Sequence, residues 1–234
     1  MKKNILILIL LATLLFGASS FAQNEKIWQR FPKFSLLKLS SFISRIDYTK
    51  LSDDDIQKFV WVDKPFNNIN YEPSDLVLLQ WYSHISSQSK HTLRIEAADA
   101  LEKMARDFYS EFWNNIVVAS AYRSYGYQKN SISESCKQSW RCAREGESEH
   151  QLWLAVDLWE ATNEEKFLSK YQNYYNRLHE NAHFYWFHQS YQNWREIDGY
   201  YIEPRHRRYL GTWLATKLHE KNITFTQYLT SLKN

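Results

Sequence analysis

The sequence predicts an α+β fold, in which a small and mostly antiparallel sheet is flanked by helices. Two observations support this class. Short apolar and β-branched runs occur among segments of helical periodicity, without the regular strand–helix alternation of a parallel sheet. The chain has 234 residues, enough for one well-packed domain, and its aromatic content of 17% with only 5 glycines and 4 prolines argues against disorder.

The N-terminus has the pattern of an export signal. Lys2 and Lys3 precede an apolar stretch over residues 5–16, and Ser20-Phe21-Ala22 places small residues where signal peptidase cuts. We therefore expect residues 1–22 to be a signal peptide, and the mature protein to be exported, periplasmic or secreted, without stable membrane insertion after cleavage. An uncleaved membrane anchor is the alternative, although the apolar run is short for a bilayer span.

Charge and cysteine content narrow the possible partners. The formal net charge is +3, and removal of the two signal lysines lowers it to +1. A nearly neutral mature chain gives no indication of a nucleic-acid partner. The two cysteines, Cys136 and Cys142, are close enough in an exported chain to be candidates for one small disulfide; two unpaired thiols are the alternative.

The first half of the mature chain contains one strong helical pattern. Residues 23–59 have weak patterning and form an N-terminal extension of unknown role, where Ser52 followed by three aspartates indicates a helix start. The main domain is expected over residues 60–234. Within it, residues 61–73 and 83–91 have loop composition around a short apolar piece, and the apolar residues of Leu93 to Trp113 recur at three- and four-residue steps, as in a helix.

The second half mixes strands and helices. Ile116 to Ala119 and Leu154 to Leu158 are apolar and read as buried strands. Asn163 can cap a helix from Glu164 to about Asn181. Further short strands are expected at residues 184–187 and 199–202, a helix at 207–220, and a short segment at 224–232.

A candidate metal site arises from two separate stretches. Catalytic zinc takes three protein ligands and leaves one position open for water, and imidazole nitrogen and carboxylate oxygen suit it. His150, Asp157 and His206 supply such a set, and Asp157 ends an apolar run, where a lone carboxylate would be costly without a cation. Glu203 lies three residues before His206, so its carboxylate could act as general base beside the metal.

A rival metal motif is also present. His179-Glu180-Asn181-Ala182-His183 is a literal HExxH, which on a helix places two histidines on one face with the glutamate as base. Glu203 would then be a third ligand. The motif falls where the predicted helix ends, so the alternative is a solvated His179 and a packed or capping His183.

Several blocks between Trp61 and Leu232 together carry a family resemblance. They are Trp61-Val62-Asp63-Lys64, Tyr71 to Leu76, Leu93 to Ala98, Ser120-Ala121-Tyr122-Arg123-Ser124-Tyr125 with Gln128, Ser148-Glu149-His150-Gln151 to Ala155-Val156-Asp157, Asn181-Ala182-His183, and Gly199 to Tyr209. In this combination the chain resembles the VanY-type D-alanyl-D-alanine carboxypeptidases, zinc peptidases that trim peptidoglycan and include L,D-carboxypeptidases.

The resemblance implies a role for each candidate residue. It implies that His150, Asp157 and His206 bind Zn²⁺ and that Glu203 is the catalytic base. It further implies that Arg123 polarises the scissile carbonyl or grips the substrate, and that Ser148, Gln128 and Ser120 belong to the substrate-binding residues. The implied activity is removal of C-terminal D-alanine from peptidoglycan stem peptides. A catalytically silent peptidoglycan-binding protein of the same fold and a cell-wall endopeptidase are the alternatives.

Four positions depart from the family pattern. The family usually has glycine where this chain has Trp153 and Trp186, proline at Glu145, and tryptophan at Arg205. Glycine permits close backbone approach and unusual dihedral angles, and tryptophan disfavours both. None of the four removes a candidate ligand or the base, so the departures concern the shape of the pocket and thereby the exact substrate.

Overall fold

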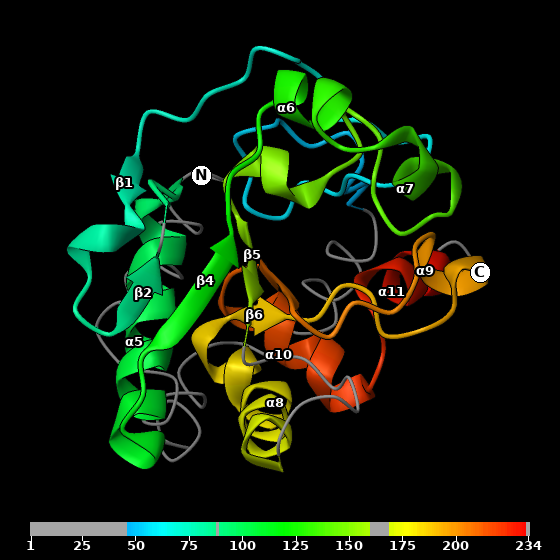
Figure 1. The fold of residues 1–234 in the computed structure, drawn as a ribbon. Coiled ribbons are helices and arrows are strands. Elements are labelled where there is room, and N and C mark those ends of the chain that lie inside the picture. Colours follow the sequence, from blue (N-terminus) through cyan, green and yellow to red (C-terminus); the bar gives the residue numbers. More distant parts are fainter. Residues whose placement is uncertain (1–45, 88, 160–168, 233–234) are drawn as a thin grey trace, which may run out of the picture. The chain divides into compact units, whose positions relative to one another are not determined.

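A five-stranded sheet lies at the centre of the computed structural model, which describes residues 46–87, 89–159 and 169–232. Its strands follow the order β2 (Ile85–Ser87), β4 (Ile116–Ser120), β5 (Ala155–Leu158), β7 (His206–Tyr209) and β6 (Phe187–His188) (Figure 1). β2 runs parallel to β4, and every other neighbouring pair is antiparallel. β1 (Leu76–Leu78) and β3 (Thr92–Arg94) form a separate antiparallel ribbon. The predicted α+β class with a small, mostly antiparallel sheet is confirmed.

The long helix α5 (Ile95–Phe112) packs against β2 and β4. Its apolar residues share one face, and Leu101, Met104 and Phe108 are buried there. Full burial of such a side chain contributes about 1.5–3 kcal/mol. The helix agrees with the predicted segment except that Leu93 and Arg94 belong to β3, and it ends at Trp113 in the left-handed conformation.

The shorter helices surround the sheet. They are η1 (Leu79–Trp81), α6 (Tyr125–Asn130), α7 (Glu134–Gln138), η2 (Glu149–Leu152), α8 (Ser169–Asn181), η3 (Ala182–Tyr185), α9 (Arg195–Asp198), α10 (Thr212–Lys221) and α11 (Phe225–Ser231). In Figure 1, α6 and α7 lie beyond the end of β4. η3 contacts α5, α8 and α10 beside β6. Within the described ranges, none of the helices combines the length and apolar character needed to span a bilayer.

The compact unit that holds these elements begins at Asp47, ahead of residue 60, where the sequence analysis starts the main domain. Tyr48 is fully buried and packs edge-on against Phe225 and near Tyr228. The other unit covers residues 1–46, so the expected signal peptide and most of the N-terminal extension lie outside the described residues.

Several local predictions are wrong, each for a physical reason. Residues 52–58 form turns, because the Asp53 carboxylate accepts hydrogen bonds from the backbone N–H groups of Asn67 and Asn68 in a distant loop. The expected loop at 83–91 contains β2, which parallel pairing with β4 holds in place. Residues 199–202 form no strand, and 184–185 belong to η3. The expected helix at 207–220 begins only at Thr212, because residues 206–209 form β7 between two neighbouring strands.

Candidate active site

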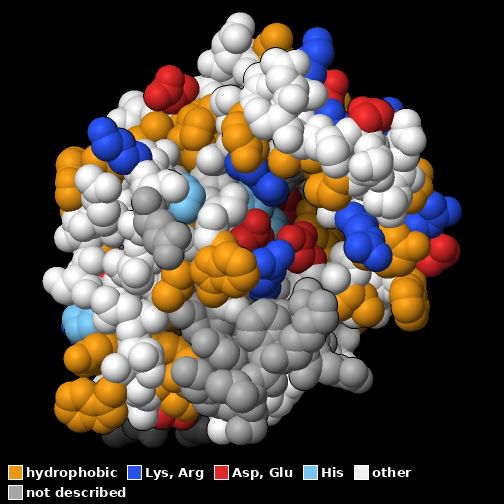
Figure 2. Space-filling view, in the orientation of Figure 1, with side chains coloured by type: hydrophobic (Ala, Val, Ile, Leu, Met, Phe, Trp, Pro, Cys, Tyr) orange, Lys and Arg blue, Asp and Glu red, His pale blue; other side chains and the backbone are white. Residues whose placement is uncertain are grey.

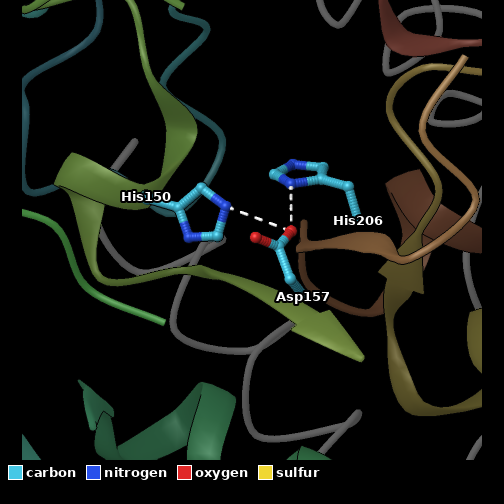
Figure 3. Close-up of side chains that lie close together, drawn as sticks. All are labelled: His150, Asp157 and His206. Atoms are coloured by element: carbon cyan, nitrogen blue, oxygen red, sulfur yellow. Dashed lines mark hydrogen bonds and ion pairs between the residues drawn. The ribbon is translucent and has the colours of Figure 1, made fainter. Parts of the chain in front are cut away.

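Strand pairing places three candidate metal ligands together. Asp157 in β5 is the antiparallel partner of His206 at the start of β7, and His150 approaches from η2 (Figure 3). His150 Nε2 lies 3.3 Å and His206 Nδ1 lies 3.2 Å from the same oxygen, Asp157 Oδ1. All three residues are buried, and one ligand atom from each falls within 4.8 Å of the others. The structure thus brings together the three ligands expected from the sequence.

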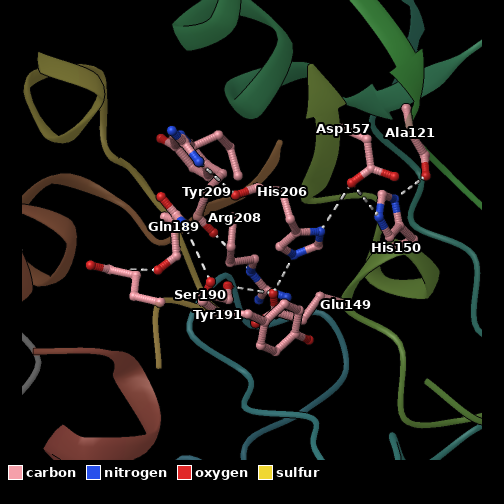
Figure 4. Close-up of polar contacts among 12 residues, drawn as sticks. Ala121, Glu149, His150, Asp157, Gln189, Ser190, Tyr191, His206, Arg208 and Tyr209 are labelled. Atoms are coloured by element: carbon pink, nitrogen blue, oxygen red, sulfur yellow. Dashed lines mark hydrogen bonds and ion pairs between the residues drawn. The ribbon is translucent and has the colours of Figure 1, made fainter. Parts of the chain in front are cut away.

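The outer nitrogen of each imidazole is already held by the protein. His150 Nδ1 donates to the Ala121 carbonyl at 2.5 Å, and His206 Nε2 donates to the Glu149 carboxylate at 2.8 Å (Figure 4). These bonds place a proton on His150 Nδ1 and on His206 Nε2, and leave His150 Nε2 and His206 Nδ1 turned toward Asp157. His150 Nε2 is buried without a hydrogen-bond partner, which fits an atom that binds a cation. Two imidazoles and one carboxylate are a donor set that Zn²⁺ accepts.

The surrounding charges act differently on the two imidazoles. Burial, followed by the nearby Arg123 guanidinium, lowers the pKa of His150 to about 4. Burial alone would also lower the pKa of His206, but hydrogen bonds to Asp157 and Glu149 raise it to about 10. Contacts with His150, and then with His206, hold the pKa of Asp157 well below its usual value despite burial. A metal ion would therefore replace the proton on His206 Nδ1.

Glu149 is a functional candidate that sequence reasoning missed. Its side chain is 4% exposed and accepts hydrogen bonds from His206 Nε2 and, at 2.6 Å, from the Ser190 hydroxyl. Burial alone would raise its pKa, but the His206 hydrogen bond and the Arg208 charge lower it to about 2. Glu149 thus orients His206 as an ionised carboxylate. The sequence contained one signal that could have identified Glu149: it is a charged residue directly before His150, in a stretch that ends in an apolar strand.

Glu203 lines the same cleft as two of the candidate ligands, His150 and His206. The cleft has a volume of about 50 Å³, and other polar side chains complete its wall. Figure 2 shows a hollow near the centre of this face where acidic, basic and histidine side chains meet. Burial and the Asp157 charge raise the pKa of Glu203 to about 7. The Glu203 carbonyl accepts a hydrogen bond from the His206 backbone N–H at 3.2 Å. Residues 203–206 therefore form a tight turn that links Glu203 to the candidate ligand His206.

The four expected substrate residues divide into two groups. Arg123 and Ser148 line the cleft, and Arg123 Nε is buried without a partner. Gln128 and Ser120 are not among its lining residues. Gln128 is fully buried and donates at 2.6 Å to the carbonyl of Ala143, a residue that does line the cleft. Ser120 stands opposite Asp157 in the sheet.

The remaining wall of the cleft includes residues to which the sequence analysis gave no role in the site. Tyr191, Tyr200 and Arg141 line it, and so does Cys142, which forms the candidate disulfide with Cys136. The Tyr200 hydroxyl contacts Glu147 Oε2 at 3.3 Å. Tyr191 lies in no quoted motif and Tyr200 had no assigned role, because the two become neighbours only when the loops on either side of α9 fold over the sheet.

The HExxH motif does not form a metal cluster. α8 ends at Asn181, between the two histidines, so they do not share one helical face. His179 is exposed and stacks on Tyr175, whereas His183 is buried and stacks on His219 with ring centroids 3.8 Å apart. Among the described residues, His150, Asp157 and His206 form the one group of three or more potential ligands that is close enough to hold a metal.

Both tryptophans that replace the usual glycines adopt left-handed backbone conformations. Trp153 has φ 56° and Trp186 has φ 67°, and each ends a four-residue 3-10 helix. This conformation costs a non-glycine residue roughly 1–2 kcal/mol. Trp153 is 3% exposed and stacks on Tyr122 at 3.6 Å, so aromatic burial offsets the cost. Tryptophan at these positions therefore keeps the turn that glycine would allow.

Comparison with known proteins agrees with this site. A family model described as VanY, D-alanyl-D-alanine carboxypeptidase, matches residues 90–212, more than half of the chain. The candidate carboxypeptidase YodJ of Bacillus subtilis (strain 168) is 34% identical over 176 residues, 70% of this chain and 63% of YodJ. The chain therefore spans less than two thirds of that relative.

Solved structures share the fold. The LdcB LD-carboxypeptidase, whose structure is described as revealing the basis of peptidoglycan recognition, is 29% identical with a TM-score of 0.62, over 76% of this chain and 87% of that one. A mutant of the D,D-pentapeptidase VanY from a VanB-type vancomycin-resistance cassette, solved with Zn(II), is 24% identical with a TM-score of 0.54, over 75% of this chain and 97% of that one. At that identity, the second likeness concerns the fold alone.

Proposed function

Because the chain belongs to the VanY D-alanyl-D-alanine carboxypeptidase family, we propose that it is a zinc-dependent carboxypeptidase that removes C-terminal D-alanine from peptidoglycan stem peptides. The observation that carries the proposal is the buried cluster of His150, Asp157 and His206, whose two histidines line one cleft with Glu203. These three residues would hold the zinc ion. When bound, zinc supplies a Lewis acid and lowers the pKa of water.

Glu203 is the general base of the proposed reaction. Its carboxylate takes a proton from the attacking water and gives a proton to the amine of the departing D-alanine as the C–N bond breaks. A carboxyl group whose pKa lies near 7 can do both at neutral pH. The tight turn to His206 keeps this group beside the metal ligands throughout the reaction.

Arg123 and Ser148 would hold the substrate. A stem peptide ends in a free carboxylate, which requires a cation or hydrogen-bond donors. The unpartnered Nε of Arg123 and the position of Ser148 on the cleft wall support this role. Gln128 would act indirectly, by holding the carbonyl of Ala143, a residue of the cleft wall, in position. Ser120 would act through its position opposite Asp157 in the sheet.

The activity is tested with purified mature protein. Its zinc content is measured, and it is then incubated with pentapeptide and tetrapeptide muropeptides that are analysed by mass spectrometry. We expect one bound zinc and loss of one D-alanine from at least one substrate. Zinc binding without D-alanine release would contradict the carboxypeptidase and favour a silent binding protein, and cleavage of cross-linked peptides alone would favour the endopeptidase.

We also propose that the protein is exported to the periplasm or secreted. The signal pattern in residues 1–22 and the Cys136–Cys142 disulfide support an oxidising destination. N-terminal sequencing of protein from the producing cells should begin at Gln23. The expected extension spans residues 23–59, before the proposed domain at 60–234. Because residues 47–59 belong to the compact unit, its role can be examined by comparing mature protein with and without residues 23–46.

A further inference from the structure

A second cavity lies behind the candidate active site. Successive side chains of a strand point to opposite faces of a sheet, so His206 and Arg207 of β7 face away from each other. His206 lines the catalytic cleft, whereas Arg207 lines a separate cavity of about 50 Å³ bounded by α8, η3, β6 and α10. The two cavities share no lining residue. The rear cavity is therefore not an extension of the cleft.

Arg207 is a buried cation without a counter-charge. Its side chain is 1% exposed, and no carboxylate in the described part of the chain forms an ion pair with it. The other buried cations each have an acid nearby: Lys58 has Asp53, Lys137 has Glu145, and Arg208 has Glu149. A buried charge of this kind is costly unless it is paired.

One terminal nitrogen of the Arg207 guanidinium is hydrogen-bonded to the protein, and the other is not. Nη1 donates to the backbone carbonyls of Pro204 at 2.6 Å and His206 at 3.0 Å. Nη2 is buried and has no hydrogen-bond partner. Arg207 lines the rear cavity, so a ligand with an acceptor oxygen could accept a hydrogen bond from Nη2 there.

The other polar groups of this cavity favour an oxyanion that carries a hydroxyl group. Among the described residues no Asp or Glu lines it, and burial keeps the pKa values of His183 and His188 below their usual value, so both rings are neutral at pH 7. His183 Nδ1 and Gln189 Oε1 are buried without partners. The Gln189 side chain interacts with the nearby His179 ring, but no donor in the described part of the chain lies within hydrogen-bond geometry of Gln189 Oε1. A hydrogen phosphate supplies such a donor through its P–O–H group, and an ionised carboxylate does not.

We propose that the rear cavity binds a phosphate-type oxyanion through Arg207. This inference does not depend on the proposed peptidase activity. Since Nη1 of the same guanidinium holds the carbonyls of Pro204 and His206, the bound anion also steadies the turn that carries Glu203 and His206. Inorganic phosphate and a phosphoryl group at the end of a larger ligand share the required chemistry.

The primary test measures binding of inorganic phosphate to full-length mature protein. Heats of binding and thermal midpoints are recorded with and without zinc at constant ionic strength, with acetate as the carboxylate comparison. We expect saturable phosphate binding that raises the midpoint, and a weaker or absent response to acetate. Glycerol phosphate distinguishes the source: binding of both ligands indicates a phosphoryl group with an exit to solvent, and binding of phosphate alone indicates the free ion. Absence of both would overturn the proposal.

Variants assign the binding to the rear cavity. Arg207→Met should abolish phosphate binding, whereas Arg177→Met, which removes an arginine on α8 already paired with Glu111, should retain it. Arg123→Met should also retain it, because Arg123 lines the other cavity. Loss of binding in Arg123→Met but not in Arg207→Met would place the phosphate in the catalytic cleft and overturn the proposal.

A second variant covers the case in which Arg207→Met does not fold. Gln192 is half-buried and lines the rear cavity, where its side chain donates to the Gln189 carbonyl. Gln192→Glu would bring a carboxylate of the chain itself to the cavity as a permanent counter-charge for Arg207. We expect a folded protein, checked by circular dichroism, that no longer responds to phosphate. Unchanged phosphate affinity in this variant would contradict the assignment.

Discussion

Two short helices of this protein are alike in form and differ in what surrounds them. η2 and η3 are four-residue 3-10 helices, each has a buried histidine in second place, and each ends at a left-handed tryptophan. The histidine of η2 is His150, which faces Asp157 and His206. The histidine of η3 is His183, which stacks on His219 and has an unpartnered Nδ1.

Carboxylates account for the difference between the two helices. On the cleft side, Asp157 and Glu149 hold the imidazole of His206 in place and raise its pKa to about 10. On the rear side, none of the described carboxylates lines the cavity, and burial lowers the pKa of His188 to about 3. A histidine becomes a candidate metal ligand here only where an acid converges with it, whatever its local backbone.

The largest expected effect separates the two candidate bases. Glu203→Gln should lower kcat by about 10²–10⁴-fold, the usual contribution of a general base, while zinc content stays unchanged. Glu180→Gln removes the acid of the HExxH motif and should leave kcat within about twofold, because Glu180 is exposed on α8 and the motif forms no cluster. The measurement is D-alanine release from muropeptides. A large loss of kcat in Glu180→Gln, but not in Glu203→Gln, would identify Glu180 as the base in place of Glu203.

The matched histidines test the metal site directly. His150→Ala should lower zinc affinity more than about 100-fold, since loss of a group that merely orients a ligand can already cost that much. His183→Ala, at the equivalent place in η3, should leave zinc affinity unchanged. Competition with a chelating dye gives both affinities. Equal losses of zinc affinity in the two variants would contradict the assignment of the metal site to the histidine of η2.

A smaller effect is expected from the acid that orients His206. Glu149→Gln keeps the size of the side chain but removes the charge that His206 Nε2 meets at 2.8 Å. We expect zinc affinity to fall about 10–100-fold with the fold intact. The same dye competition measures the affinity, and circular dichroism checks the fold. An unchanged affinity would assign Glu149 a packing role only.

Zinc binding should also release a proton. His206 holds two protons in the metal-free protein because its pKa is raised to about 10, so at pH 8 zinc must displace the one on Nδ1. We expect release of about one proton at pH 8, measured by calorimetry in buffers with different ionisation enthalpies. The raised pKa also stabilises the metal-free fold fully below pH 6.5, and this contribution is lost as the pH rises through about 10. No proton release would mean that His206 is neutral before zinc binds.

The sequence was most informative where pattern and chemistry coincide. The periodicity of α5 and the apolar runs of β4 and β5 predicted those elements closely, because each buries one face or both. Residue chemistry and the family resemblance together selected His150, Asp157, His206 and Glu203. The fold clusters the first three and places Glu203 in the cleft that both histidines line.

The missed features depend on contacts between distant segments. β7 has the sequence His206-Arg207-Arg208-Tyr209, and its two consecutive arginines gave no sign of a buried strand. Each is accommodated separately: Arg208 donates to the carbonyls of Ile56 and Lys58, and Arg207 to the turn before the strand. Glu149 was missed for the same reason, since its partners His206 and Ser190 are far along the chain.

The antiparallel register that places Asp157 beside His206 has a kinetic consequence. These residues are 49 positions apart in sequence, so an ion bound to both would be a reversible cross-link across the sheet. A cross-link closes a loop in the unfolded chain and lowers its entropy, by an amount that grows slowly with loop length. β5 and β7 could then not separate before the ion left, and the lifetime of the folded state would follow the residence time of the ion.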